Sequence, residues 1–123
     1  MKYVRQADLG ALEVATGRHT DRLLDRASGA RTLALNLIKT PSGEGSPEGR
    51  HTHAFDQIFY IVSGVMSLEI DGERVEAKPG SLVFIPEGLP HRNWNSGSSP
   101  SVHIAIASPL PTDGVPFAQR VAS

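Results

Sequence analysis

Apolar and polar residues alternate along several short stretches of this chain, and no stretch shows a convincing helical period. The alternation predicts strands over 31–39, 65–70, 73–77, 91–95 and 102–107, and short apolar runs predict two more over 57–63 and 82–85. In the first stretch Leu33, Leu35 and Leu37 fall on one face, which predicts a strand with one buried face. Residues 57–63 are nearly all apolar, which indicates burial on both faces, or one face in a core and the other in a barrel interior.

Turn and loop signals separate these stretches. Asp71-Gly72 predicts a tight hairpin turn, and residues 40–49 are rich enough in glycine and proline to form a loop. Pro109, Pro111 and Pro116 exclude a regular helix or a central strand from the tail. Short strands separated by turns at roughly eight- to twelve-residue spacing predict an all-β fold, an antiparallel sandwich or barrel.

The first 30 residues give a weaker signal. Leu9, Leu12 and Val14 fit either a short strand or a turn of helix. Residues 16–30 are polar and place like charges four residues apart, which disfavours a helix. The pattern assigns no definite element to this segment.

Composition then limits the possible functions. With 123 residues the chain is predicted to be one domain, with its core barrel over about 31–108. A net charge of -1 gives no reason to expect nucleic acid or a membrane as a partner. No cysteine is present, so a metal site would have to use imidazole, carboxylate, amide or water. The first residues lack the apolar core of a signal peptide, so a cytoplasmic location is expected.

Histidines provide the clearest candidate chemistry. His51 and His53 stand two residues apart in an extended stretch, so their side chains share one face of a sheet and can reach one point. Gln57 follows four residues later, and His91 comes directly after the Pro86-Glu87-Gly88 turn. This spacing is typical of a metal site.

The two clusters also match a known pattern. Gly45, five residues, His51-Thr52-His53, three residues, Gln57, six residues and Gly64 form the first half. The second half is Gly80, five residues, Pro86-Glu87-Gly88, two residues, His91, three residues and Asn95. In this order the halves resemble the two motifs of small single-domain cupins, with glutamine where the first motif normally has glutamate.

This resemblance implies a double-stranded β-helix, or jelly-roll barrel. It implies that His51, His53, Gln57 and His91 bind one divalent transition metal ion, either iron, nickel, zinc, manganese, cobalt or copper. It also implies a homodimer. The amide of Gln57 leaves the ion formally at +2, which favours substrates with carboxylate, enolate or vicinal oxygens.

Other pocket residues follow from strand alternation. Phe59 and Ile61 share the face of Gln57 and are predicted to line the cavity, and Arg50 is a candidate for binding a substrate carboxylate. His103 is the candidate acid or base. It faces the pocket if its strand neighbours Val102, Ile104 and Ile106 pack between the sheets, and faces outward if those neighbours line the pocket.

Two classes of function are consistent with these residues. The first is a small metal-dependent enzyme, either a dioxygenase or an isomerase or lyase of a sugar acid or keto acid. The second is a non-catalytic cupin that binds or senses a sugar or another small molecule. The absence of a fused DNA-binding domain from the 123 residues favours the enzyme.

Overall fold

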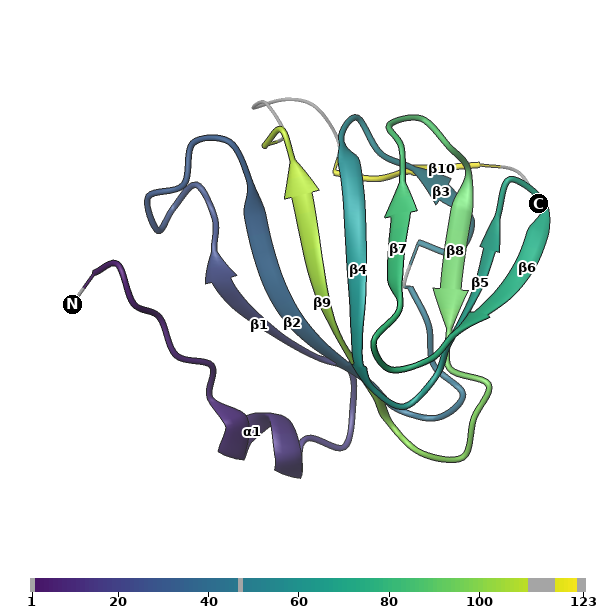
Figure 1. The fold of residues 1–123 in the computed structure, drawn as a ribbon, viewed down its shortest axis with the longest axis horizontal. Coiled ribbons are helices and arrows are strands. Elements are labelled where there is room, and N and C mark those ends of the chain that lie inside the picture. Colours follow the sequence, from purple (N-terminus) through teal and green to yellow (C-terminus); the bar gives the residue numbers. More distant parts are fainter. Residues whose placement is uncertain (1, 47, 111–116, 122–123) are drawn as a thin grey trace.

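The computed structural model describes residues 2–46, 48–110 and 117–121, which form two facing antiparallel sheets (Figure 1). The first sheet has the order β1-β2-β9-β4-β7 and the second the order β10-β3-β8-β5-β6. The strands are β1 (His19–Leu24), β2 (Ala34–Thr40), β3 (His51–Thr52), β4 (Asp56–Ser63), β5 (Met66–Ile70), β6 (Glu73–Ala77), β7 (Leu82–Ile85), β8 (His91–Trp94), β9 (Ser101–Ser108) and β10 (Gln119–Arg120). The all-β jelly-roll prediction is confirmed.

Residues 1–30 contain more structure than their sequence indicated. A short helix, α1 (Leu9–Val14), begins at Asp8, whose side chain accepts a hydrogen bond from the Ala11 amide. The polar segment that follows forms β1, which pairs with β2 at the edge of the first sheet. Its inward residues Thr20 and Arg22 line a polar cavity and none of its residues belongs to the apolar core, so β1 lacks the apolar alternation that identifies other strands. No helix in the described ranges is long and apolar enough to cross a membrane.

The core lies between the two sheets. Its buried members come from both layers and are Ile38, Phe59, Ile61, Met66, Leu68, Ala77, Ile85 and Ala105. Strand β4 therefore buries only one of its faces. Its outward residue Tyr60 is 44% exposed and its neighbour Phe84 on β7 is 53% exposed, so the expectation of burial on both faces is wrong for the single chain.

The leucines of β2 lie on the outer side of the first sheet, because Ala34, Asn36 and Ile38 line the internal cavity and adjacent residues of a strand point to opposite faces. Leu33 and Leu35 are only half-buried, whereas Leu37 is 9% exposed and counts as buried. The leucine-rich face is therefore not the interior face of this strand.

Two motif glycines are required by close backbone contacts. A Cβ atom at Gly45 would lie 2.5 Å from the Asn93 carbonyl oxygen of β8, with which the loop makes a bridge at Trp94. Gly64 has a φ of 71°, and a Cβ there would lie 2.6 Å from the Pro100 carbonyl oxygen. The predicted hairpin turn also forms, with positive φ at both Asp71 and Gly72.

Asn95 connects the end of β2 with the loop that follows β8. Its buried amide nitrogen donates to the carbonyls of Thr40 and Ser99, and its oxygen accepts from the Gly97 amide. This side chain therefore ties the loop after β8 to the end of β2. Pro111 and Pro116 of the tail lie outside the described residues, and β10 beyond them is a two-residue edge strand.

Candidate metal centre

The three motif histidines meet inside the barrel. His51 of β3 pairs directly with His91 of β8, and His53 follows two residues later on the same face. Their ligand nitrogens lie within 4.8 Å of one another, and all three side chains are buried. Gln57 reaches this region from β4 in the opposite sheet and is also buried. The centre therefore bridges the two layers.

Backbone carbonyls orient each imidazole in the same way. The Nδ1 atoms of His51, His53 and His91 lie 2.6, 2.7 and 2.9 Å from the carbonyl oxygens of Gly49, Phe117 and Leu89. Nδ1 must carry the proton to donate these bonds, which leaves Nε2 of each neutral ring with a free lone pair. Metal-binding histidines in proteins are held in this way.

The converging nitrogens have no satisfactory partners within the protein. Nε2 of His51 lies 3.1 Å from Nε2 of His53, so two lone pairs face each other. His91 Nε2 and the Gln57 side-chain oxygen are buried and have no hydrogen-bond partner in the described part of the chain. Buried polar atoms are normally satisfied, and a cation between these four groups would satisfy them together.

Burial keeps the imidazoles of His53 and His91 neutral at physiological pH. It lowers the pKa of His91 to about 4, helped by the charges of His51 and His53 and opposed by the hydrogen bond to Leu89. Burial also lowers the pKa of His53, against the hydrogen bond to Phe117. Neutral imidazole is the form that binds metal, and three imidazoles with one amide oxygen suit a divalent transition ion.

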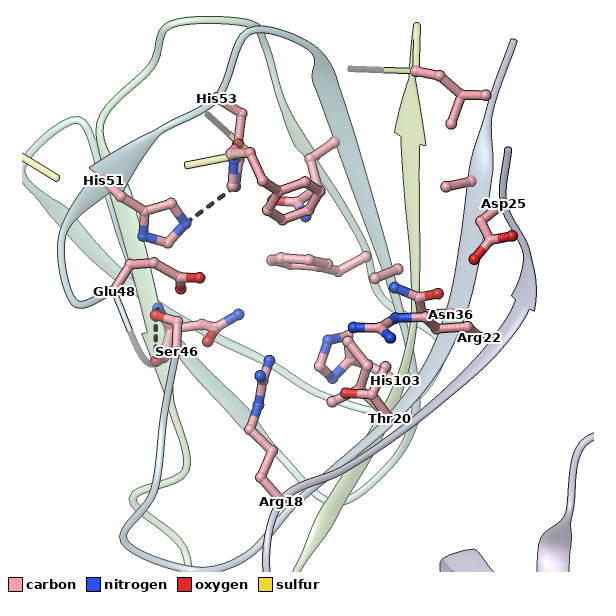
Figure 2. Close-up of a pocket in the computed structure, with 18 of the residues that line it drawn as sticks. Arg18, Thr20, Arg22, Asp25, Asn36, Ser46, Glu48, His51, His53 and His103 are labelled. Atoms are coloured by element: carbon pink, nitrogen blue, oxygen red, sulfur yellow. Dashed lines mark hydrogen bonds between the residues drawn. The ribbon is translucent and has the colours of Figure 1, made fainter. Parts of the chain in front are cut away.

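A cavity of about 550 Å³ adjoins the histidines, within the size range of small-molecule sites (Figure 2). Phe59 lines it as expected from alternation, whereas Ile61 is fully buried in the core and is not among the described lining residues. Arg50, at the start of β3, is half-buried and is also not among them.

His103 lies in the cavity wall on β9, with only 1% of its surface exposed. Its neighbours Val102, Ile104 and Ile106 are half-buried on the opposite face of the strand. The structure thus places His103 inward because the aliphatic face forms the outside of the sheet, an arrangement that neither alternative described.

Sequence reasoning missed several polar residues of this cavity. Glu48, three residues before His51, lines the wall, and Figure 2 shows its carboxylate beneath the His51 ring. Arg18 and Arg22 enter from β1 and its approach, and Asn36 enters from β2. The spacing of Arg18, Thr20 and Arg22 at every second residue could have indicated that they share one face of a strand. Arginines on an edge strand usually face solvent, however, so this spacing alone did not point to the cavity.

The family described as Cupin domain matches residues 36–107, more than half of the chain and both motifs. The chain belongs to this cupin family. This identification confirms the resemblance drawn from the motif spacing and agrees with the clustering of the three histidines.

Among curated proteins, this cupin is 32% identical over 96 residues to the tetracenomycin polyketide synthase protein TcmJ of Streptomyces glaucescens. The match covers 76% of the chain and 63% of that relative, so the chain spans less than two thirds of its length. Solved structures with the same fold include the polyketide cyclase RemF of Streptomyces resistomycificus, at a TM-score of 0.71 and 19% identity, covering 100% of this chain and 84% of RemF.

A double-stranded β-helix protein of Methanocaldococcus jannaschii has a TM-score of 0.72 at 22% identity, with 88% of this chain and 91% of that one covered. At these identities the structural likenesses establish the fold alone.

Proposed function

We propose that this cupin is a metal-dependent enzyme acting on a small oxygen-rich or anionic substrate by non-redox chemistry, in the manner of an isomerase, lyase or cyclase. The observation that carries the proposal is the convergence of three Nε2 atoms and the Gln57 oxygen on one point beside a cavity. These four groups would hold the ion. When bound, a divalent ion supplies a Lewis acid that polarises a substrate oxygen.

The chain itself supplies the groups that would move a proton. Removing a proton from the carbon next to a carbonyl leaves an electron pair that delocalises onto the carbonyl oxygen, and a general base such as a carboxylate accepts that proton. Glu48 is the acidic side chain beside His51, and its carboxylate faces the cavity (Figure 2). Glu48 is therefore proposed as the base, and its protonated form as the acid that returns the proton.

A keto acid or polyketone is the proposed substrate class. Such compounds combine acidic carbon-bound protons with oxygens that favour a centre of neutral ligands, because none of the four proposed metal ligands carries a negative charge. The likeness to TcmJ, whose name associates it with polyketide synthesis, supports a substrate with several keto groups. Apolar walls at Ile38, Phe59 and Phe117 would pack against its carbon skeleton.

Metal content tests the first half of the proposal. Elemental analysis of the protein purified without added metal should find one transition metal ion per chain, and His51→Ala should lose most of it. His19→Ala is the matched control, because His19 lies on β1 outside the cluster. Unchanged metal content in His51→Ala would disprove the site.

Turnover tests the second half. Deuterium exchange at the methylene of 2-oxobutyrate, followed by proton NMR in D₂O, should be catalysed and should slow by roughly 10²- to 10⁴-fold in Glu48→Gln. Glu44→Gln, in the same loop but exposed, should behave as wild type. Oxygen consumption without exchange, across a panel of keto acids and phenolics, would identify a dioxygenase instead. Tight binding of these compounds with neither activity would identify a binding module.

A further inference from the structure

A second polar cluster lines the cavity away from the three histidines. Alternate residues of the approach to β1 and of β1 itself place Arg18, Thr20 and Arg22 on the cavity wall, and β2 and β9 add Asn36 and His103 (Figure 2). These residues come from adjacent strands of the first sheet. None of them belongs to the metal centre, so they form a separate feature of the same cavity.

His103 is the buried member of this cluster. Only 1% of its surface is exposed, and both ring nitrogens are buried without a hydrogen-bond partner among the described residues. One ring face is occupied by the edge-to-face contact with Phe59, at 5.0 Å between centroids. Burial, helped by the Arg18 charge, lowers the pKa of His103 to about 4, so the neutral ring has one donor and one acceptor to offer.

Arg18 places a positive charge beside that ring. Its Nε is buried and has no hydrogen-bond partner in the described part of the chain. Burial lowers the pKa of Arg18, and the carboxylates of Glu48 and Glu44 oppose this shift, so the guanidinium stays charged. The charged side chains around the described cavity are Arg18, Arg22, Arg26, Asp25 and Glu48, which leaves an excess of positive charge.

We propose that Arg18 and His103, together with Asn36, form a subsite for an anionic oxygen group, a carboxylate or an enolate or phenolate, at the end of the substrate remote from the metal centre. The guanidinium and the imidazole N–H would donate to this group, and charge-assisted donors of this kind bind planar oxyanions strongly. The inference rests on the proposed function, because one molecule then occupies both ends of the cavity. It narrows the substrate class to compounds with an oxygen-bearing group at each end.

Calorimetry on zinc-loaded protein tests the subsite with two matched probes, glutarate and pentanoate, which have the same number of carbons but two carboxylates and one. Wild type should bind glutarate at least about tenfold more tightly, and Arg18→Gln should remove most of this preference while binding pentanoate as before. Arg31→Gln, an exposed arginine outside the cavity, should keep the preference. A second pair, 3-hydroxybenzoate and benzoate, tests whether a phenolic oxygen can take the place of the second carboxylate.

Full retention of the glutarate preference in Arg18→Gln, or its absence from wild type in both probe pairs, would overturn the subsite. Zinc content measured on the same samples separates the two proposals. If the wild-type protein failed to bind zinc, the metal-dependent function would be refuted. If it bound zinc but did not prefer the probes with two oxygen-bearing groups, only the subsite would be refuted.

Ring nitrogen spectra test the contact with His103 directly. The chain has five histidines, and the resonance missing from His103→Gln assigns this one. Glutarate should shift it in the zinc-loaded wild type, and pentanoate should not. If Arg18→Gln weakened glutarate binding while the His103 resonance stayed unmoved, the role of His103 in the subsite would be refuted.

Discussion

Stability at acidic pH should depend on the unsatisfied imidazole of His103. In the folded protein burial and the Arg18 charge lower its pKa to about 4, whereas an unfolded histidine titrates near about 6.5. The unfolded chain therefore binds the proton more tightly. The contribution of the neutral ring to the free energy of unfolding is fully present above about pH 6.5. It is lost as the pH falls towards the pKa that His103 has in the folded protein.

The magnitude follows from these two pKa values. Between pH 7 and pH 5 the unfolded histidine becomes almost fully protonated and the folded one stays neutral, which costs about 2 kcal/mol for this single group. Carboxylates and the other histidines also make the stability depend on pH, so the test compares wild type with His103→Gln. Urea denaturation of both metal-free proteins at the two pH values should show that His103→Gln loses about 2 kcal/mol less than wild type. Equal losses in the two proteins would refute the assignment of His103 as a buried neutral ring.

Three further outcomes are expected. Asn95→Ala removes three hydrogen bonds, one buried and two partly buried, and should lower the free energy of unfolding by about 2–4 kcal/mol in urea denaturation; a loss below roughly 1 kcal/mol would contradict its role as a connector of loops. Deletion of residues 117–123 removes the carbonyl that orients His53 and should weaken zinc binding by roughly 10- to 100-fold in a competitive chelator titration, with unchanged affinity as the contrary result. The exposed outer face at Tyr60 and Phe84 should mediate a homodimer, so light scattering should give twice 13.2 kDa for wild type and 13.2 kDa for a double glutamate variant; a monomeric wild type would exclude this.

The inner strands and the metal centre were predictable because each leaves a local signature in the sequence. Strand β5 alternates, the Asp71-Gly72 turn has the backbone conformation its residues prefer, and the spacing between His51 and His53 fixes a shared face. The motif glycine Gly45 was recognisable by its position. The reason why glycine is required there could be seen only in the folded structure. A Cβ atom at this position would lie 2.5 Å from the Asn93 carbonyl oxygen, which belongs to a strand distant in sequence.

Features of the cavity that arise from long-range pairing were not predictable. Strand β1 lies at a sheet edge, so nothing in its local sequence shows that Arg18 faces inward rather than into solvent. Glu48 sits in a loop whose path is set by the contact of Gly45 with β8. The orientation of His103 depended on whether the aliphatic face of β9 packs inside or outside, and strand alternation alone treats these two choices as equal.

Electrostatics connects the two ends of the cavity. Three neutral imidazoles and an amide would give a bound divalent ion no negatively charged ligand, and the opposite wall adds more arginines than carboxylates. Replacing Gln57 by glutamate would supply the missing charge at the first end and reduce the need for an anionic substrate there. With glutamine in place, both ends favour negative charge. Under the proposed function, the amide at position 57 and the arginines of β1 and its approach would therefore act together, favouring a substrate with an oxygen-bearing group at each end.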